Sequence, residues 1–299
     1  SILNQTYSNF RLLISDDCSK DNTREILEEY EKKDNRIKVF YQEKNLGYVK
    51  NFEFLLTQVE NEIYALSDQD DVWLPDKIEK TYKKMKETNS DLVFTDLEVV
   101  NEKLEMIYPS FNDHMLLTRK IKKYKDSYLM QYLYNCITGC TLMSKKSFLN
   151  KVIPIPTNSE YVIHDTWIGL IVSLNGKIEY LDETTIKYRQ HGNNQVGTDK
   201  ISHKFKKLDD VRNLFIDVKI QLFTTYVNNE NIFPKQIKIQ NREALKYFEM
   251  LKAKKNFNFK NWNIFYKIYK TEKFSYRVEN FAIMNFPLIT KIPFIIRHF

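Results

Sequence analysis

The stretch Ser67–Asp76 constrains the fold of this chain more than any other. A short apolar run, Ile63–Leu66, precedes it and predicts a buried strand. Pro75 stands where helices favour their first residue, and Lys77–Thr88 is rich in helix formers. The carboxylates of this stretch are therefore expected at the C-terminal tip of a strand, where open α/β sheets bind their ligands.

These carboxylates belong to Asp68, Asp70 and Asp71, and like charges so close together repel one another. A hard divalent cation with oxygen ligands, Mg²⁺ or Mn²⁺, is expected among them, and it would hold an anionic diphosphate. The alternative is a solvated acidic turn that caps the next helix. For an isolated Asp-x-Asp-Asp this alternative is favoured, because short acidic motifs often match by chance.

The rest of the first half alternates short apolar runs with amphipathic ones. The pattern predicts strands at Phe10–Ser15, Ile37–Tyr41, Ile63–Ser67, Leu92–Asp96, Thr141–Met143 and Lys177–Leu181. It predicts one helix that begins at Asp21, a second that runs through Asn51 to Thr57, and others at Lys77–Thr88, Ile121–Tyr134 and Ile168–Leu174. It also predicts a hairpin at Leu97–Ile107. Such alternation indicates an α/β fold with a mainly parallel sheet and helices on both faces. The tips that carry Asp17 and Asp70 would then face a single ligand.

Later segments add candidate site residues. Gly139 and Cys140 lie in a turn of small residues that suits either a pocket or tight backbone packing, and the residues leave both open. Asp165 precedes an apolar helix and fits an N-cap, a role compatible with catalysis. A lone histidine is usually structural, but His191 follows Arg189, and the pair suits a diphosphate and its metal.

The net charge of +7 and the pI near 9.0 favour anionic partners. Nucleic acid is not expected, because the aromatic residues of the first half have core spacing rather than the exposure of a stacking platform. From residue 200 onward, helical patterns carry lysines on one side, as in Lys204–Lys207, and Phe257–Phe299 is dense in aromatic residues and lysine. This part predicts either a solvated helical extension or, as we favour, peripheral contact with an anionic membrane.

Two observations bear on location. The three cysteines lack the paired spacing of a zinc site, and no secretory signal is visible, so a reduced cytoplasm is expected, with contact at the inner face of the cell membrane. No run is apolar for the roughly 20 residues that span a bilayer. The nearest, Phe281–Phe299, is interrupted by Asn285, Lys291 and two prolines.

In its ordered motifs the chain resembles the family 2 glycosyltransferases, which have the GT-A nucleotide-diphospho-sugar transferase fold. The matching segments are Ser1–Tyr7, Ser15–Thr23, Asn45–Gly47, Asp68–Lys77, Gly139–Thr141, His164–Trp167 and Tyr188–Asn194. They cover Ser1 to about Gly197, and the ordered set is far more specific than any one motif. The acidic segment, His-Asp-Thr-Trp and Tyr-Arg-Gln-His look most like the rhamnosyltransferase branch.

The resemblance implies an inverting, metal-dependent transferase that uses Mg²⁺ or Mn²⁺. Asp165 matches the general base. The implied donor-binding residues are Asp17, Gly47, Asn51, Asp68, Asp70 and Arg189. The implied metal ligands are Asp70, Asp71 and His191. The implied sugar and acceptor pocket comprises Trp73, Gly139, Cys140, His164 and Trp167.

The resemblance also implies partners: a nucleotide-diphospho-sugar, with dTDP-L-rhamnose leading, and a saccharide or lipid-linked saccharide acceptor. It predicts a transferase domain over residues 1–199 whose first strand is missing, and a basic helical extension over 200–299. Two other functions fit some features. An inactive transferase-like binding protein would explain the net charge, and a nucleotidyltransferase would also use a metal, although it normally shows a Gly-rich phosphate loop.

Overall fold

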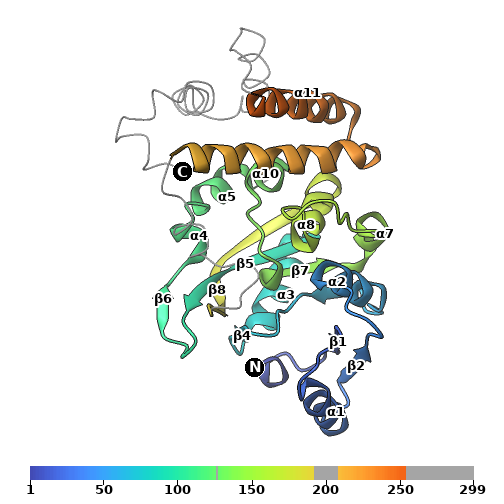
Figure 1. Ribbon diagram of the computed structural model, residues 1–299. Coiled ribbons are helices and arrows are strands. Elements are labelled where there is room, and N and C mark those ends of the chain that lie inside the picture. Colours follow the sequence, from blue (N-terminus) through green and yellow to red (C-terminus); the bar gives the residue numbers. More distant parts are fainter. Residues whose placement is uncertain (126, 192–207, 254–299) are drawn as a thin grey trace. The chain divides into compact units, whose positions relative to one another are not determined.

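The computed structural model describes residues 1–125, 127–191 and 208–253 (Figure 1). The chain divides into two compact units. The first comprises Ser1–Thr157 and Ile163–Gln195, and the second contains the last two described helices together with Asn158–Val162. The predicted domain boundary at residues 199 and 200 lies outside the described residues and stays a prediction.

The first unit alternates strands and helices. Its strands are β1 (Leu12–Asp16), β2 (Ile37–Tyr41), β3 (Ile63–Ala65), β4 (Val72–Trp73), β5 (Leu92–Val100), β6 (Met106–Tyr108), β7 (Leu142–Lys145) and β8 (Ile178–Arg189). Its α-helices are α1 (Thr23–Lys33), α2 (Tyr48–Thr57), α3 (Lys77–Thr88), α4 (Phe111–His114), α5 (Thr118–Tyr124), α6 (Leu129–Tyr134), α7 (Leu149–Val152) and α8 (His164–Asn175). The 3₁₀ turns of this unit are η1 (Ile2–Asn4), η2 (Gly139–Thr141) and η3 (Lys146–Phe148).

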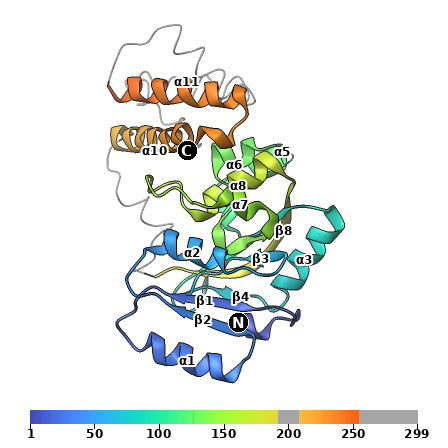
Figure 2. The same cartoon turned by 90° about the vertical axis from the view of Figure 1, so that its right-hand side faces the viewer.

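The strands form two sheets rather than one mainly parallel sheet. β1 and β2 pair in parallel, with α1 on one side and α2 on the other (Figure 2). The larger sheet has the order β3-β7-β5-β8-β4, with β6 also on β5. Only β5 and β8 are parallel there, so the predicted mainly parallel pairing is wrong for this sheet. The short turn between β5 and β6 can join only antiparallel strands, which confirms the predicted hairpin.

β5 is the centre of the core. It extends beyond its predicted end at Asp96, and Leu92, Val93 and Val99 are fully buried. β8 likewise runs past Leu181 as one continuous strand to Arg189. That extension carries the end of β8 to the loop between β3 and β4, because β8 pairs with both β5 and β4.

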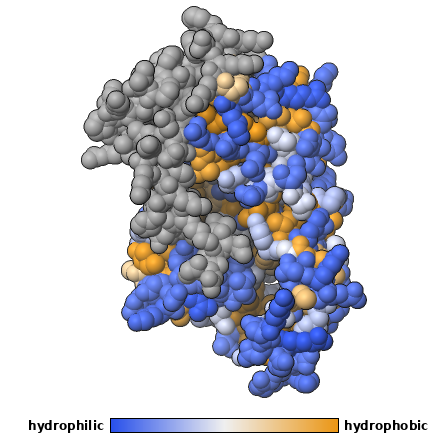
Figure 3. All heavy atoms as spheres, viewed as in Figure 1, coloured by the Kyte–Doolittle hydropathy of each residue, from blue (hydrophilic) through white to orange (hydrophobic). Residues whose placement is uncertain are grey.

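One predicted helix is divided. The segment Ile121–Tyr134 forms α5 and α6 instead of a single helix. Between them, the Ser127 N–H bonds the Tyr124 carbonyl, and the Ser127 hydroxyl accepts the Leu129 N–H. A serine that binds the nearby backbone in this way competes with helical hydrogen bonds. At the β5–β6 hairpin, Leu104, Met106 and Ile107 are exposed. Figure 3 shows apolar side chains of this face in orange among hydrophilic ones in blue.

The described part of the second unit is helical, as predicted. Its described helices are α10 (Leu208–Asn228), η4 (Glu230–Ile232) and α11 (Lys235–Lys252), and Phe233–Pro234 separates η4 from α11. The stacked rings of Phe223 and Phe248 form its core. The basic run Lys204–Lys207 and the segment Phe257–Phe299 lie outside the described residues. Within the described ranges, no helix has the length and apolar character needed to cross a membrane.

Candidate active site

The acidic loop between β3 and β4, which holds Asp68, Asp70 and Asp71, is fixed from both ends. On one side the Gln5 amide donates to the Leu74 carbonyl at 2.7 Å and accepts from the Ile78 N–H at 3.0 Å. The amino-terminal segment therefore anchors the stretch between the loop and α3. The glutamine amide can do this because it offers a donor and an acceptor together.

On the other side, the end of β8 holds the loop. The Arg189 N–H donates to Asp71 Oδ1 at 3.2 Å, and Arg189 Nε donates to the Asp70 carbonyl at 2.8 Å. His191 Nε2 lies 2.8 Å from Asp70 Oδ2. Two predicted metal ligands, Asp70 and His191, are thus hydrogen-bonded to each other. This clamp follows from the length of β8, which the sequence pattern underestimates.

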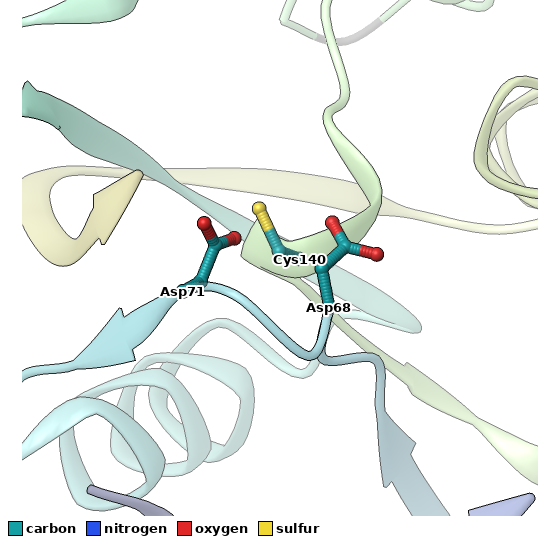
Figure 4. Close-up of side chains that lie close together, drawn as sticks. All are labelled: Asp68, Asp71 and Cys140. Atoms are coloured by element: carbon teal, nitrogen blue, oxygen red, sulfur yellow. The ribbon is translucent and has the colours of Figure 1, made fainter. Parts of the chain in front are cut away.

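Asp68 and Asp71 point toward Cys140 on η2 (Figure 4). One carboxylate oxygen of each aspartate and the Cys140 Sγ lie within 4.8 Å of one another. Burial, together with the charges of Asp71, Asp165 and Asp70, raises the pKa of Asp68 to about 7. Burial also raises the pKa of Asp71 to about 6, opposed by the nearby Cys140 thiol and the Arg189 N–H. These two groups therefore change charge near neutral pH.

Asp165 lies in the first turn of α8 and is held by backbone groups. Its Oδ2 accepts the Gly139 N–H at 2.8 Å, and its Oδ1 accepts the Thr166 N–H at 2.5 Å. The N-cap of α8 is Ile163, so the N-cap interpretation of Asp165 is wrong. A Cβ on Gly139 would lie 3.2 Å from Asp165 Cβ and 3.2 Å from His164 Nε2. Glycine is therefore what lets η2 approach this carboxylate.

His164 packs against α2, because its ring stacks on Phe52 with centroids 4.1 Å apart. Burial lowers its pKa, and the Asp165 charge opposes that effect. The buried His164 Nδ1 has no hydrogen-bond partner among the described residues. The neutral ring thus lies directly beside the candidate base.

The predicted nucleotide contacts on β1 and α2 have a different environment. Asp17 accepts the Leu46 N–H at 2.7 Å and the Gly47 N–H at 2.9 Å. Gly47 has φ +77°, which the turn into α2 requires. The Asn51 amide accepts from the Ser15 hydroxyl at 2.6 Å and donates to the Ser15 carbonyl at 3.0 Å. These side chains join β1 to the start of α2.

Both tryptophans assigned to the sugar pocket belong to the core, which corrects the prediction. Trp73 is 5% exposed and packs with Leu97 and Ile186. Trp167 is 2% exposed, and its Nε1 donates to the Val152 carbonyl at 2.9 Å. No ring face remains for a sugar. The motif placed them beside polar site residues, but neighbouring residues on a strand or helix point in different directions.

Sequence reasoning missed Lys77, the first residue of α3. Its side chain is 1% exposed, and its ammonium lies 4.6 Å from the centroid of the Trp73 ring. Burial lowers the pKa of Lys77 to about 8, and the neighbouring Cys140 and Asp71 side chains oppose that shift. No local signal could have found this residue, since a lysine at the start of a helix normally extends into solvent.

Comparisons with known proteins identify the family and the fold of this chain. Residues 1–150 match the model described as Glycosyl transferase family 2. A dTDP-rhamnosyl transferase of Shigella flexneri, RfbG, is 30% identical over 226 residues, which is 71% of this chain and 74% of the relative. An O-antigen biosynthesis glycosyltransferase of Escherichia coli, WbnJ, is 32% identical over 200 residues, which is 64% of this chain and 72% of the relative.

Among solved structures, residues 1–349 of S. aureus TarS in complex with UDP-GlcNAc match with a TM-score of 0.56. The match covers 95% of this chain and 78% of that chain, at 17% sequence identity. At that identity the likeness concerns the fold alone. The predicted GT-A fold with a helical C-terminal part is thereby confirmed.

Proposed function

Because the chain belongs to glycosyl transferase family 2 and is a glycosyltransferase of polysaccharide biosynthesis, we propose that it is an inverting, metal-dependent enzyme. It moves a sugar from a nucleotide-diphospho-sugar to a hydroxyl of a growing surface polysaccharide or a lipid-linked saccharide. The observation that carries the proposal is the meeting of the acidic loop with Asp165. Asp165 lies close enough to the loop that its charge contributes to the raised pKa of Asp68.

The donor set suits a divalent cation, Mg²⁺ or Mn²⁺. Asp71 Oδ2 is buried without a hydrogen-bond partner among the described residues, as expected of an atom reserved for a ligand. Asp71 would hold the cation together with Asp70 or Asp68, and His191 reaches the same loop through Asp70. When bound, such a cation stabilises the negative charge that develops on the leaving diphosphate.

Asp165 acts as the general base in this proposal. The acceptor oxygen forms a bond to the anomeric carbon as the bond to the donor phosphate breaks, and Asp165 takes the hydroxyl proton. A single displacement of this kind inverts the anomeric configuration. The hydrogen bonds from Gly139 and Thr166 fix the carboxylate beforehand, so the base does not have to be oriented during the reaction.

Other residues support binding. Arg189 steadies the acidic loop and would contact the donor phosphates. Asp17, Gly47 and Asn51 join β1 to the start of α2, and we call these three residues the wall. Their polar groups already bind the backbone and Ser15, so they would act on the nucleotide mainly by fixing the position of the wall. Gly139, Cys140 and His164 would line the acceptor side of the site, because a Cβ on Gly139 would touch both Asp165 and His164.

For the donor, the name of RfbG supports dTDP-L-rhamnose, whereas the TarS complex contains UDP-GlcNAc. Contact with the inner face of the cell membrane is proposed on the basic composition alone. Sedimentation of the protein with anionic vesicles tests it, because a protein that stays in the supernatant lacks the contact.

The decisive experiment offers the protein a panel of nucleotide sugars, among them dTDP-L-rhamnose, UDP-glucose and UDP-GlcNAc, with Mn²⁺ or with a chelator. One donor should raise the melting temperature only when Mn²⁺ is present. Transfer from that donor to a saccharide acceptor, followed by NMR of the product, should show an inverted anomeric centre. Retention of configuration, or transfer undiminished by the chelator, would refute the mechanism. Donor binding without transfer to any acceptor would favour an inactive binding protein.

A further inference from the structure

The cluster of Asp68, Asp71 and Cys140 contains a ligand type that Mg²⁺ does not use. Figure 4 shows the Cys140 sulfur directed into the space that the two carboxylates also face. Mg²⁺ requires near-octahedral oxygen ligands, whereas a thiolate selects softer ions. Two carboxylate oxygens and one sulfur are instead a donor set suited to a four-coordinate zinc ion with one position left open.

The Cys140 thiol is a buried part of this cluster and not an exposed surface group. Cys140 is 1% exposed and forms no disulfide. The buried Asp71 Oδ2 beside it has no hydrogen-bond partner among the residues that the structure describes. A wholly buried oxygen without a partner costs folding free energy unless a ligand satisfies it. The unpartnered Asp71 oxygen therefore lies beside a buried thiol, where one metal ion could bind both.

We propose that Asp68, Asp71 and Cys140 form a binding site for one thiophilic divalent cation, Zn²⁺. Cd²⁺ and Co²⁺ would bind the same site and serve as its spectroscopic probes. Binding replaces the thiol S–H bond by a sulfur–metal bond and releases the proton to solvent. Two carboxylates and a thiolate then balance the charges of the cation and of the buried Lys77 ammonium, which interacts with both Cys140 and Asp71.

The ion would compete with the hard cation of sugar transfer, because both need Asp71. Only this competition rests on the proposed function, since the binding itself needs no donor or acceptor. The site thereby makes the enzyme sensitive to free zinc: a tightly held tetrahedral ion would occupy the position from which Mg²⁺ or Mn²⁺ stabilises the leaving diphosphate.

The test is a titration of the metal-free full-length protein with Cd²⁺, and separately with Co²⁺, that follows the thiolate-to-metal charge-transfer absorption in the ultraviolet. The band should saturate at about one ion per chain. C140S and C140A should lose it, and D68N should weaken binding by roughly tenfold or more. Two of these changes keep the size of the side chain, and near-ultraviolet circular dichroism checks that each variant is folded.

The matched controls are C136S and C18S. Cys136 is also buried but lies beside Lys120, outside the carboxylate pair, and Cys18 is exposed. Both variants should keep the band. Absence of the band in the wild type, or its persistence in folded C140S and C140A, would overturn the proposal.

Competition is read separately, by the electron paramagnetic resonance of free Mn²⁺. Zn²⁺ should release bound Mn²⁺ from the wild type, and it should do so roughly tenfold less effectively from C140S. Simultaneous binding of both ions would overturn the shared site. A charge-transfer band that depends on Cys140, in a protein that transfers no sugar from any donor, would leave the zinc site standing and refute the proposed function.

Discussion

The wall between β1 and α2 and the pocket around the acidic loop use similar polar residues in opposite ways. At the wall, the Asp17 carboxylate and the Asn51 amide bind backbone groups and Ser15, and these bonds fix a turn. In the pocket, Asp68 and Asp71 are half-buried beside other acidic groups, and their pKa values are raised to about 7 and about 6.

The difference teaches where free energy is available for binding. A side chain whose hydrogen bonds are complete in the folded protein stabilises the fold. A buried charge that lacks a partner opposes folding, and a ligand that satisfies it gains that energy. We therefore expect mutations in the pocket to change chemistry and pH dependence, and mutations at the wall to change stability.

The largest effect is expected for Asp165→Asn. The amide cannot take a proton, but its oxygen can still accept the Gly139 N–H, so the fold should be preserved. The kcat of transfer should fall by about 10²–10⁴-fold, the usual contribution of a general base. Asp182→Asn, at an exposed carboxylate that pairs with Lys122, is the control and should keep full activity. Normal turnover by Asp165→Asn would mean that this residue of the pocket does not act in the chemistry.

Gly139→Ala should come next. The added Cβ would press on Asp165 Cβ and His164 Nε2, both 3.2 Å away, and displace the base by a few tenths of an ångström. Misplacement on this scale should lower kcat by roughly tenfold to a hundredfold, with a smaller change in KM. Steady-state kinetics measures the two parameters. A variant that loses stability without losing kcat would assign Gly139 to packing alone.

Asp68→Asn tests the pocket through stability. The folded pKa of Asp68, about 7, lies above the unfolded value of about 3.9. The metal-free protein therefore loses stability as pH rises from about 4 to about 7, because the unfolded state releases this proton first. The asparagine variant lacks that loss and should gain roughly 2–4 kcal/mol relative to the wild type over this range. The upper figure is the full difference between the two pKa values, and the lower one allows for solvent screening of the half-buried Asp68.

Urea denaturation in the presence of a chelator, at pH 5 and at pH 8, measures the difference. The variant should be more stable than the wild type at pH 8, and the gap should narrow at pH 5. An equal difference in stability between variant and wild type at pH 5 and at pH 8 would mean that folding does not raise the pKa of Asp68.

The smallest effect is expected at the wall. Asn51→Ala removes two hydrogen bonds to Ser15 and should cost roughly 1–2 kcal/mol of stability at every pH. Below the melting temperature, kcat should stay within a few-fold of the wild type. Thermal unfolding and kinetics on the same sample compare the two. A large loss of kcat without loss of stability would place Asn51 in the chemistry.

Much of the site was within reach of the sequence. The motifs predicted that the acidic loop, Asp17 and Asp165 gather at one site. In the structure Asp68 lies beside Asp71 and interacts with the charge of Asp165. The meeting of Asp17 and Asp70 at a single ligand stays a prediction. The motifs could not separate side chains that enter the pocket from neighbours that enter the core, as Trp73 and Trp167 do. Nor could they foresee that a lysine at the start of α3 is buried, because that depends on what packs above it.

The sequence by itself determined the α/β class, the order of most elements and the chemical identity of the acidic loop, because local periodicity and turn residues act over a few positions. The tertiary structure decided the pairing of the strands, the reach of β8 to Asp70 and Asp71, and the approach of Gly139 to Asp165. These depend on contacts between residues that are far apart in the chain, where burial and close packing, not local preference, select the arrangement.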